Sequence, residues 1–234
     1  MRSVYQWAMI VALLGLVWSA VSCAGATTSA PSAEEASAPS SSGTSAPQGS
    51  SAVARTFVFE VQPTTEARYR VREQLANLNF PSDAVGVTNA VTGKLVLNAS
   101  GHVVPEESRI VVDLRQLRSD SEMRDNYLRR TTLQTSLYPA AEFAVKELAG
   151  LPWPLPASGE LPIQVAGDLT IRGVTRPTMW DAVVTFNGDE VSGLATTSFR
   201  FADFGMRVPT VLVVLSVEDN IRAELDFRFR MLEQ

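Results

Sequence analysis

Alternation of apolar and polar positions is the strongest pattern in this chain, and it is longest over residues 163–186. Two alternating runs there flank a short segment that contains Gly173 and Pro177. A period of two places one face of a strand in a core and the other face in water. Two such strands around a turn that contains Gly and Pro predict a β-hairpin.

Similar alternation recurs after residue 55 and predicts a domain built of strands. Further strands are expected over Thr56–Val61, Glu66–Glu73, Val91–Asn98, Arg109–Leu114, Glu142–Leu148, Glu190–Phe201 and Asn220–Met231. A common apolar side in nearly every strand favours a closed sheet, because closure buries one face and removes the sheet edges. The pattern therefore predicts an all-β fold, a closed antiparallel barrel of eight strands or up to ten.

Three segments interrupt this regular pattern. Residues 75–86 are mixed in polarity, which favours a loop or a short helix near a barrel mouth. Residues 151–162 are rich in Pro and predict a loop. The valine-rich residues 208–217 fit either a strand or a loop at the barrel mouth.

One helical insertion is predicted between the strands. Ser119 with Glu122 three residues later has the pattern of a capping box, and Met123, Tyr127 and Leu128 follow at helical spacing. Pro139 ends the regular helix, because a residue before Pro is driven towards extended geometry. A lid or plug over one barrel end and a crossover helix packed outside the barrel fit this segment equally well.

The N-terminal residues 1–22 have the pattern of a secretory signal, with Arg2 before the uncharged run Trp7–Val21. Cys23 follows the small residues that close this segment, as in a bacterial lipobox, where cleavage precedes the Cys and its sulfur receives a diacylglyceryl group. This predicts an exported protein of the cell membrane or cell envelope, anchored by lipid at Cys23. An ordinary signal peptide and a secreted protein are the alternative.

Residues 23–54 are almost entirely Ala, Ser, Thr, Pro and Gly after the Cys, with no aromatic residue. Such a composition cannot bury enough apolar surface to offset its ordering entropy, so we expect a disordered tether. The folded domain is expected to occupy residues 55–234.

Composition removes most routes to catalysis. The formal net charge of −5 gives no basic surface for nucleic acid, and a single Cys excludes a disulfide within the chain. His102 is the one His, so neither a metal site nor a His-based catalytic centre is expected. Five carboxylates were considered as candidate acid or base groups, and most of them are expected on solvent-facing sides of the strands and helix. They are Asp125, Asp168, Asp181, Asp203 and Asp226. No catalytic residue and no cofactor are predicted.

Three segments resemble the YceI-like family, bacterial lipid-binding barrels outside the cytoplasm. They are MRDNYLRR…LYPAAEF within Met123–Phe143, GDLTIRGVTRP at Gly167–Pro177, and SFRFADFGM at Ser198–Met206, in the order of the family. The resemblance covers residues 57–232. It implies a lipocalin-like barrel that carries a polyisoprenoid or another long amphipathic lipid.

The alternation and this resemblance together predict the ligand contacts. Interior, lipid-binding positions are expected at Leu169, Ile171, Trp180, Val184, Phe186, Phe199, Phe201, Leu225, Phe227 and Phe229. At the barrel mouth, Arg124, Asp125 and Tyr127 are candidates for contact with a lipid headgroup. From the pattern alone, side chains from opposite walls could equally interdigitate and fill the barrel.

The predicted function is therefore a non-catalytic lipid-binding module that holds a long apolar, isoprenoid ligand outside the cytoplasm. A ligand-free structural or interaction domain on the cell surface is the first alternative. A lipid-modifying hydrolase or isomerase is the second, and it would need two carboxylates that converge inside the pocket. The predicted partners are a long-chain apolar lipid and the membrane, and a homodimer is left open.

Overall fold

The computed structural model describes residues 55–76, 79–210 and 214–233. The predicted signal segment, Cys23 and the tether lie outside the described residues. All strands and both buried apolar clusters of the described residues lie within residues 56–233. A sheet with its own apolar core is the mark of a domain, so residues 55–234 are the part of the chain expected to fold alone. Across the described residues, every helix is too short or too polar to span a bilayer.

The domain is built of strands with a few short helical turns. The strands are β1 (Thr56–Val61), β2 (Glu66–Leu75), β3 (Ser82–Thr88), β4 (Val91–Asn98), β5 (Arg109–Asp113), β6 (Arg118–Ser119), β7 (Ala140–Ala149), β8 (Ser158–Ile171), β9 (Val174–Asn187), β10 (Glu190–Phe199) and β11 (Val214–Glu233). The helical elements are η1 (Leu114–Gln116), α1 (Glu122–Tyr127), η2 (Leu128–Thr132) and η3 (Phe201–Phe204).

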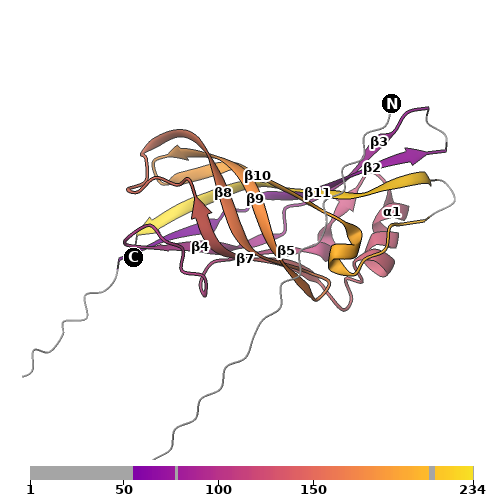
Figure 1. The fold of residues 1–234 in the computed structure, drawn as a ribbon, viewed down its shortest axis with the longest axis horizontal. Coiled ribbons are helices and arrows are strands. Elements are labelled where there is room, and N and C mark those ends of the chain that lie inside the picture. The colour runs from indigo at the N-terminus through magenta and orange to yellow at the C-terminus, as the bar shows by residue number, and fades with distance from the viewer. Residues whose placement is uncertain (1–54, 77–78, 211–213, 234) are drawn as a thin grey trace, which may run out of the picture. The chain divides into compact units, whose positions relative to one another are not determined.

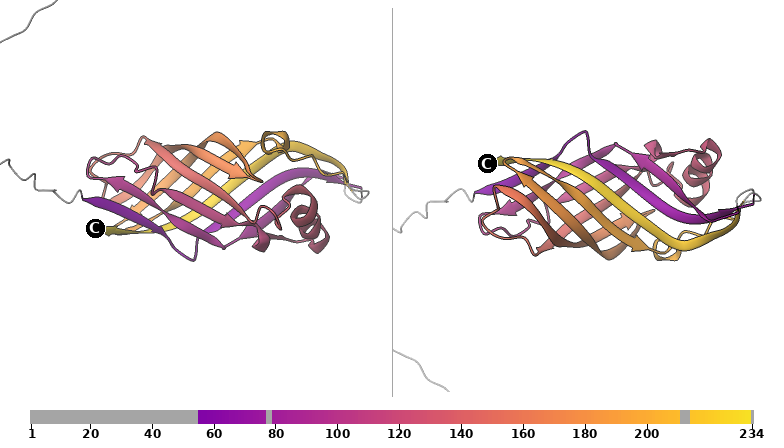
Figure 2. Two further views of the ribbon diagram at one scale, coloured as in Figure 1. Left: turned by 90° about the horizontal axis from the view of Figure 1, so that it is seen from below. Right: turned by 90° about the horizontal axis from the view of Figure 1, so that it is seen from above.

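Eight of the strands form a ring, in the order β1-β4-β5-β7-β8-β9-β10-β11, with every pair antiparallel. The ring is completed by β11 and β1, which pair from Phe57 opposite Glu233 to Val61 opposite Phe229. Figures 1 and 2 show the strands crossing the domain at a tilt, with the C-terminus at the end where β1 begins. The prediction of an all-β fold is confirmed.

Beyond the ring, a smaller sheet extends one end of the molecule. The first half of β11 pairs with β2 instead of β1, and β3 and β6 continue this sheet outwards. Thr65, which is fully buried at the bend between β1 and β2, fixes the bend to β11. Its hydroxyl donates to the Arg228 carbonyl at 3.1 Å and accepts from the Arg228 amide at 3.0 Å.

At this same end, which we call the helical end, lie α1, η2, η3 and the turn between β8 and β9 (Figure 2). The α1 helix is held against the smaller sheet by an ion pair of 2.7 Å between Arg124 and Glu73 of β2. The opposite end of the ring is covered by the loop between β7 and β8. Trp153 of this loop packs edge-on against Phe57 and donates its Nε1–H to the Ala99 carbonyl at 3.1 Å.

The predicted hairpin is confirmed and is the longest pairing in the fold. Strands β8 and β9 have 14 residues each and pair from Ser158 opposite Asn187 to Ile171 opposite Val174. Arg172 and Gly173 form the two-residue turn, with φ angles of 53° and 73°. Two positive φ values define a type I′ turn, which matches the twist of the flanking strands. Arg is an unusual choice here, because a left-handed conformation is costly for a residue with a Cβ.

Several predicted boundaries were wrong. Residues 82–88 form β3 rather than a loop or helix. Its most deeply buried side chains, Ala84 and Thr88, are small. Such small residues make the apolar alternation hard to recognise in the sequence. Gly is required at position 86, because the Tyr69 ring occupies the space where a Cβ would lie. The predicted loop over residues 151–162 ends earlier, since β8 begins at Ser158. Of residues 208–217, those from Val214 on belong to β11.

The predicted capping box is also wrong. The N-cap of α1 is Ser121, whose side chain accepts from the Arg124 amide, so Glu122 is the first residue of the helix. Ser119 lies in β6 instead, where its hydroxyl donates to Asp125 at 2.7 Å. The expected helical stripe fails at Met123, which is 76% exposed.

Candidate functional site

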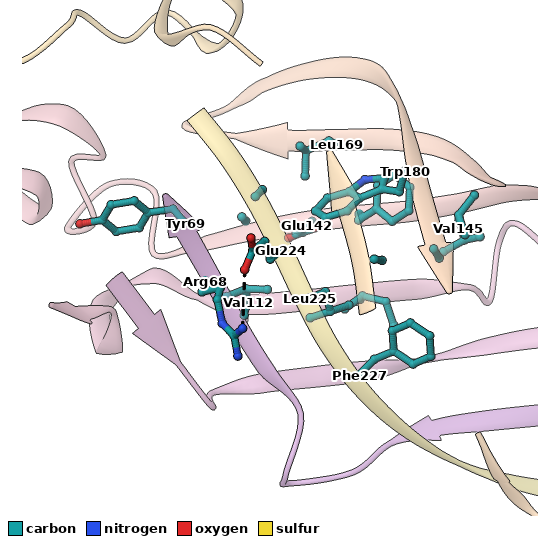
Figure 3. Close-up of a pocket in the computed structure, with 18 of the residues that line it drawn as sticks. Arg68, Tyr69, Val112, Glu142, Val145, Leu169, Trp180, Glu224, Leu225 and Phe227 are labelled. Atoms are coloured by element: carbon teal, nitrogen blue, oxygen red, sulfur yellow. Dashed lines mark ion pairs between the residues drawn. The ribbon is translucent and has the colours of Figure 1, made fainter. Parts of the chain in front are cut away.

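A largely apolar cavity of about 270 Å³ lies inside the ring and is lined by side chains from all eight ring strands and from β2. Three charged residues, Arg68, Glu142 and Glu224, are also part of its lining (Figure 3). Its walls are the inward-facing positions of the alternating strands. On β11, for example, the lining includes Ile221, Ala223, Leu225, Phe227 and Phe229. These positions span eight residue steps, or roughly 26 Å along the strand at about 3.3 Å per step. The cavity is therefore long in the direction of the strands.

All ten residues predicted as interior positions line this cavity: Leu169, Ile171, Trp180, Val184, Phe186, Phe199, Phe201, Leu225, Phe227 and Phe229. Their contact with a lipid stays a prediction. Further lining residues, on the N-terminal half of the domain, are not among the predicted interior positions; they include Phe59, Tyr69, Leu95, Leu97, Ile110, Val112 and Val145. The same alternation within their strands could have identified them.

Small side chains keep part of the interior open. Ala182 of β9 and Ala195 of β10 are directly opposite each other in the sheet, and both are buried and line the cavity. The neighbouring wall is aromatic, with the Phe227 and Phe229 rings 5.3 Å apart between centroids. Methyl groups facing rings leave a slot where larger side chains would interdigitate and close the space.

Helical elements and a loop cover the two ends of the cavity. At the helical end, the lining includes Leu128 and Thr132 of η2, Leu133 just after it, and Met206 after η3. At the opposite end, Leu151 and Leu155 of the β7–β8 loop reach inwards. The helical insertion thus contributes to the cavity through η2, while α1 lies farther out on the smaller sheet (Figure 1). This arrangement favours the lid over the external crossover.

Two polar atoms are buried among these apolar groups. The Trp180 Nε1 and the Tyr69 hydroxyl have no hydrogen-bond partner among the described residues. The Tyr69 hydroxyl points away from the cavity centre, to the side opposite Trp180 and Leu169 (Figure 3). Burial raises the pKa of Tyr69, so this phenol stays protonated and neutral.

The three residues proposed for the mouth do not line the cavity. Arg124 is engaged by Glu73 at 2.7 Å and by Asp120. The Asp125 carboxylate accepts from the Ser119 amide at 2.9 Å and from its hydroxyl at 2.7 Å. Asp125 was expected to face solvent and is 7% exposed, because it fixes α1 to β6. Tyr127 is half-buried. Contact of these side chains with a headgroup stays a prediction.

Glu224 of β11 is a second buried carboxylate, and it is among the residues that line the cavity. It alternates along the strand with the cavity residues Ala223 and Leu225, and its side chain is 6% exposed. Three arginines pair with it. Arg70 and Arg222 lie 3.0 Å from Oε1. Arg68 lies 3.6 Å from Oε2, and Figure 3 shows this pair. The guanidinium groups come from β2 and β11, so this carboxylate joins the smaller sheet to the ring.

The described residues do not form a metal centre. No group of three or more His, Cys, Asp or Glu side chains lies within metal-binding reach in this part of the chain. His102 is exposed in a turn, where its backbone amide donates to Asn98 Oδ1 at 3.1 Å. The cavity itself offers apolar contact along its length, which suits a hydrophobic ligand.

The geometry is that of an all-β domain with a largely apolar interior cavity, an arrangement shared by small β-proteins that hold one ligand. A family model described as the YceI-like domain matches residues 59–229. The match spans well over half of the chain, and the chain belongs to the YceI-like family.

Relatives and solved structures agree with this assignment. The chain is 35% identical over 116 residues to a UPF0312 protein of Pseudomonas putida strain W619, covering 45% of this chain and 56% of that protein. A UPF0312 protein of Shewanella denitrificans is 26% identical over 152 residues, covering 62% and 75%. The chain thus spans little more than half the length of the first of these relatives.

Two solved structures share the fold at low sequence identity. A polyisoprenoid binding domain from Saccharophagus degradans, implicated in plant cell wall breakdown, superposes with a TM-score of 0.58 at 12% identity, covering 75% of this chain and 98% of that one. BcnA of Burkholderia cenocepacia gives a TM-score of 0.52 at 16% identity, covering 72% and 98%. At these identities the likeness concerns the fold.

Proposed function

We propose that this domain is a lipocalin-like barrel that holds a long apolar lipid, of the isoprenoid class, in its interior. The observation that carries the proposal is the cavity, which is long and lined mainly by apolar side chains from every strand of the ring. Family membership and the fold shared with a polyisoprenoid binding domain support the isoprenoid class.

The energetics of such a cavity suit a hydrocarbon chain. Each buried methylene contributes about 0.8 kcal/mol, so a chain that follows the cavity gains affinity from length rather than from directed polar contacts. The ordering of a flexible chain offsets part of this gain. A semi-rigid chain with repeated double bonds loses less conformational freedom than a saturated chain of equal length, and this favours an isoprenoid.

The role we propose is binding without catalysis. The second alternative from sequence requires two carboxylates that converge in the pocket. Two carboxylate residues, Glu142 and Glu224, are among those that line the cavity. Both are held in ion pairs, Glu142 by Arg109 at 2.8 Å and Glu224 by Arg70 and Arg222 at 3.0 Å. We further propose that the protein is exported and held at the cell envelope through a lipid on Cys23, with residues 24–54 as the tether.

Fluorescence of Trp180 tests ligand entry directly. In residues 55–234 the tryptophans are Trp153 and Trp180, so Trp153→Phe leaves the cavity residue as the single reporter. Titration with a long-chain isoprenoid quinone, whose ring quenches indole emission, is expected to quench Trp180 saturably at one ligand per chain. Quenching that rises linearly with quinone and never saturates would contradict binding inside the barrel.

A further inference from the structure

The helical end carries a group of arginines that contrasts with the acidic composition of the chain. The formal net charge is −5, yet five arginines cluster on this end without an ion pair among the described residues. They are Arg130, Arg172, Arg176, Arg200 and Arg207, and we call them the arginine collar. Four of the five are exposed, and Arg172 is half-buried.

Contacts join Arg172 and Arg176 to η3 and to the segment after η2, the elements that carry the other three arginines. Arg172 donates to the Gly205 carbonyl and to Gln134 Oε1, and Arg176 Nε donates to the Asp203 carbonyl at 2.9 Å. These acceptors are neutral, so the positive charges are not compensated by the contacts that position them. Arg130 belongs to η2, and Arg200 and Arg207 flank η3.

The carboxylates next to the collar are already engaged by backbone groups. Asp203 accepts from the Arg200 amide at 2.7 Å, and Asp219 accepts from the Phe201 amide at 2.9 Å. Both therefore serve as local anchors of η3, but the donors are neutral backbone amides and the carboxylates keep their charge. Five arginines against these two carboxylates leave a net charge of +3 among these seven side chains. The strained backbone of Arg172, with φ of 53°, holds its guanidinium over η3 within this surface.

Apolar side chains are exposed on the same surface. Leu137 is 70% exposed, and Tyr138 and Val208 are each 36% exposed. The Tyr138 ring packs against the β8–β9 turn, where a Cβ on Gly173 would lie 2.9 Å from the ring. Val208 follows Arg207 directly. Exposed apolar groups framed by uncompensated arginines are typical of surfaces that enter the headgroup region of a membrane.

The same elements form the helical end of the cavity. η2 contributes Arg130 to the collar and Leu128 and Thr132 to the cavity lining, and η3 lies between Arg200 and the cavity residue Met206. At this end, a water-insoluble ligand would pass directly between the cavity and the partner that is bound to the collar. This continuity favours a lipid bilayer over an acidic protein as the occupant.

We propose that the arginine collar, with Leu137, Tyr138 and Val208, docks the domain on an anionic phospholipid bilayer, from which the cavity takes up or to which it delivers its ligand. The uptake or delivery of a ligand in this proposal rests on the proposed function. Each arginine near an anionic surface adds to the attraction, and the apolar side chains insert among the headgroups. Docking by this end is independent of the predicted lipid on Cys23.

Flotation with lipid vesicles tests the docking, using residues 55–234 so that no lipid anchor contributes. The domain is expected to float with vesicles that contain about one third phosphatidylglycerol and to stay in solution with pure phosphatidylcholine. Raising NaCl from about 0.1 M to about 1 M is expected to release it, because the Debye length falls from about 10 Å to about 3 Å. Failure of the wild-type domain to float with anionic vesicles at low salt overturns the proposal and leaves an acidic protein as the partner.

Matched variants separate the collar from total charge. Arg130→Gln with Arg200→Gln and Arg207→Gln is expected to lower vesicle partitioning about 100-fold, since each arginine contributes about fivefold. The control, Arg55→Gln with Arg228→Gln and Arg230→Gln, removes the same charge at the opposite end, where β1 pairs with the end of β11. It is expected to float like the wild type. Equal losses in both variants would overturn the assignment to the collar.

The Trp180 titration keeps the two proposals distinguishable. Both triple variants are expected to bind the quinone like the wild type, because none of the substituted residues lines the cavity. Saturable quenching without flotation would reject the docking surface alone. Loss of quenching in the wild-type domain would reject the proposed function itself.

Discussion

Replacing Ala195 with Trp is expected to abolish ligand binding, with occupancy falling from about one lipid per chain to below about a tenth. Ala195 is 7% exposed, lines the cavity and faces the equally small Ala182 across the strand pair. An indole at this position fills the slot between the methyl groups and the aromatic wall. Overpacking is expected to cost about 1–3 kcal/mol of stability, which leaves the domain folded. Native mass spectrometry measures the occupancy, and thermal unfolding measures the stability.

Leu194→Trp provides the matched control for this substitution. Leu194 precedes Ala195 on β10, points to the outer face and is 38% exposed. The same indole therefore lies outside the ring and is expected to leave lipid occupancy unchanged. If Ala195→Trp retains full occupancy while it remains folded, the ligand does not occupy the cavity. If both variants lose the ligand, the loss reflects strain in β10 rather than blocking.

Glu224→Ala is expected to destabilise the domain by about 2–3 kcal/mol. The carboxylate is 6% exposed and has Arg70 and Arg222 within 3.0 Å, so its removal leaves a group of positive charges without their shared partner. Loss of one member of a buried ion pair costs about 3–5 kcal/mol, and the partial exposure of the arginines reduces this figure. Denaturant unfolding at neutral pH measures the change.

Asp226→Ala is the control on the same face of the same strand. The side chain of Asp226 is 38% exposed, and its nearest partner is the exposed Arg228. An exposed pair of this kind contributes about 0–1 kcal/mol. Equal destabilisation by the two substitutions would show that the arginine cluster around Glu224 contributes no more than an ordinary surface pair.

The sequence was informative wherever burial follows the strand period. The β8–β9 hairpin was predicted because large apolar residues alternate along both strands and the turn contains Gly173. The same alternation identified nine cavity residues on the ring strands, since an inward-facing position on a ring is also an alternate position on its strand. The tenth, Phe201, was predicted as part of a strand that ends at Phe199, and it reaches the cavity from η3. Strand β3 was missed because Ala84 and Gly86 carry too little apolar surface to mark the buried face.

Contacts between residues far apart in the chain could not be predicted in this way. Glu224 has the expected phase for solvent, yet it is buried by Arg70, which is 154 residues away. Asp125 is buried by a segment that sequence analysis had assigned to the helix cap. The arginine collar likewise depends on three segments, η2, the turn end of the β8–β9 hairpin and the flanks of η3, which the topology brings to one end of the ring. Tertiary partners, rather than local periodicity, decide the exposure of these charged residues.

The most direct test of the account is native mass spectrometry of residues 55–234, expressed in a bacterium and purified without detergent, followed by organic extraction. The account predicts one long-chain lipid per chain, retained through purification and identified in the extract as an isoprenoid. It further predicts that Ala195→Trp lacks this lipid and Leu194→Trp retains it. A wild-type domain that carries no lipid and gains none when isoprenoid lipids are added would contradict the account and favour a ligand-free interaction domain.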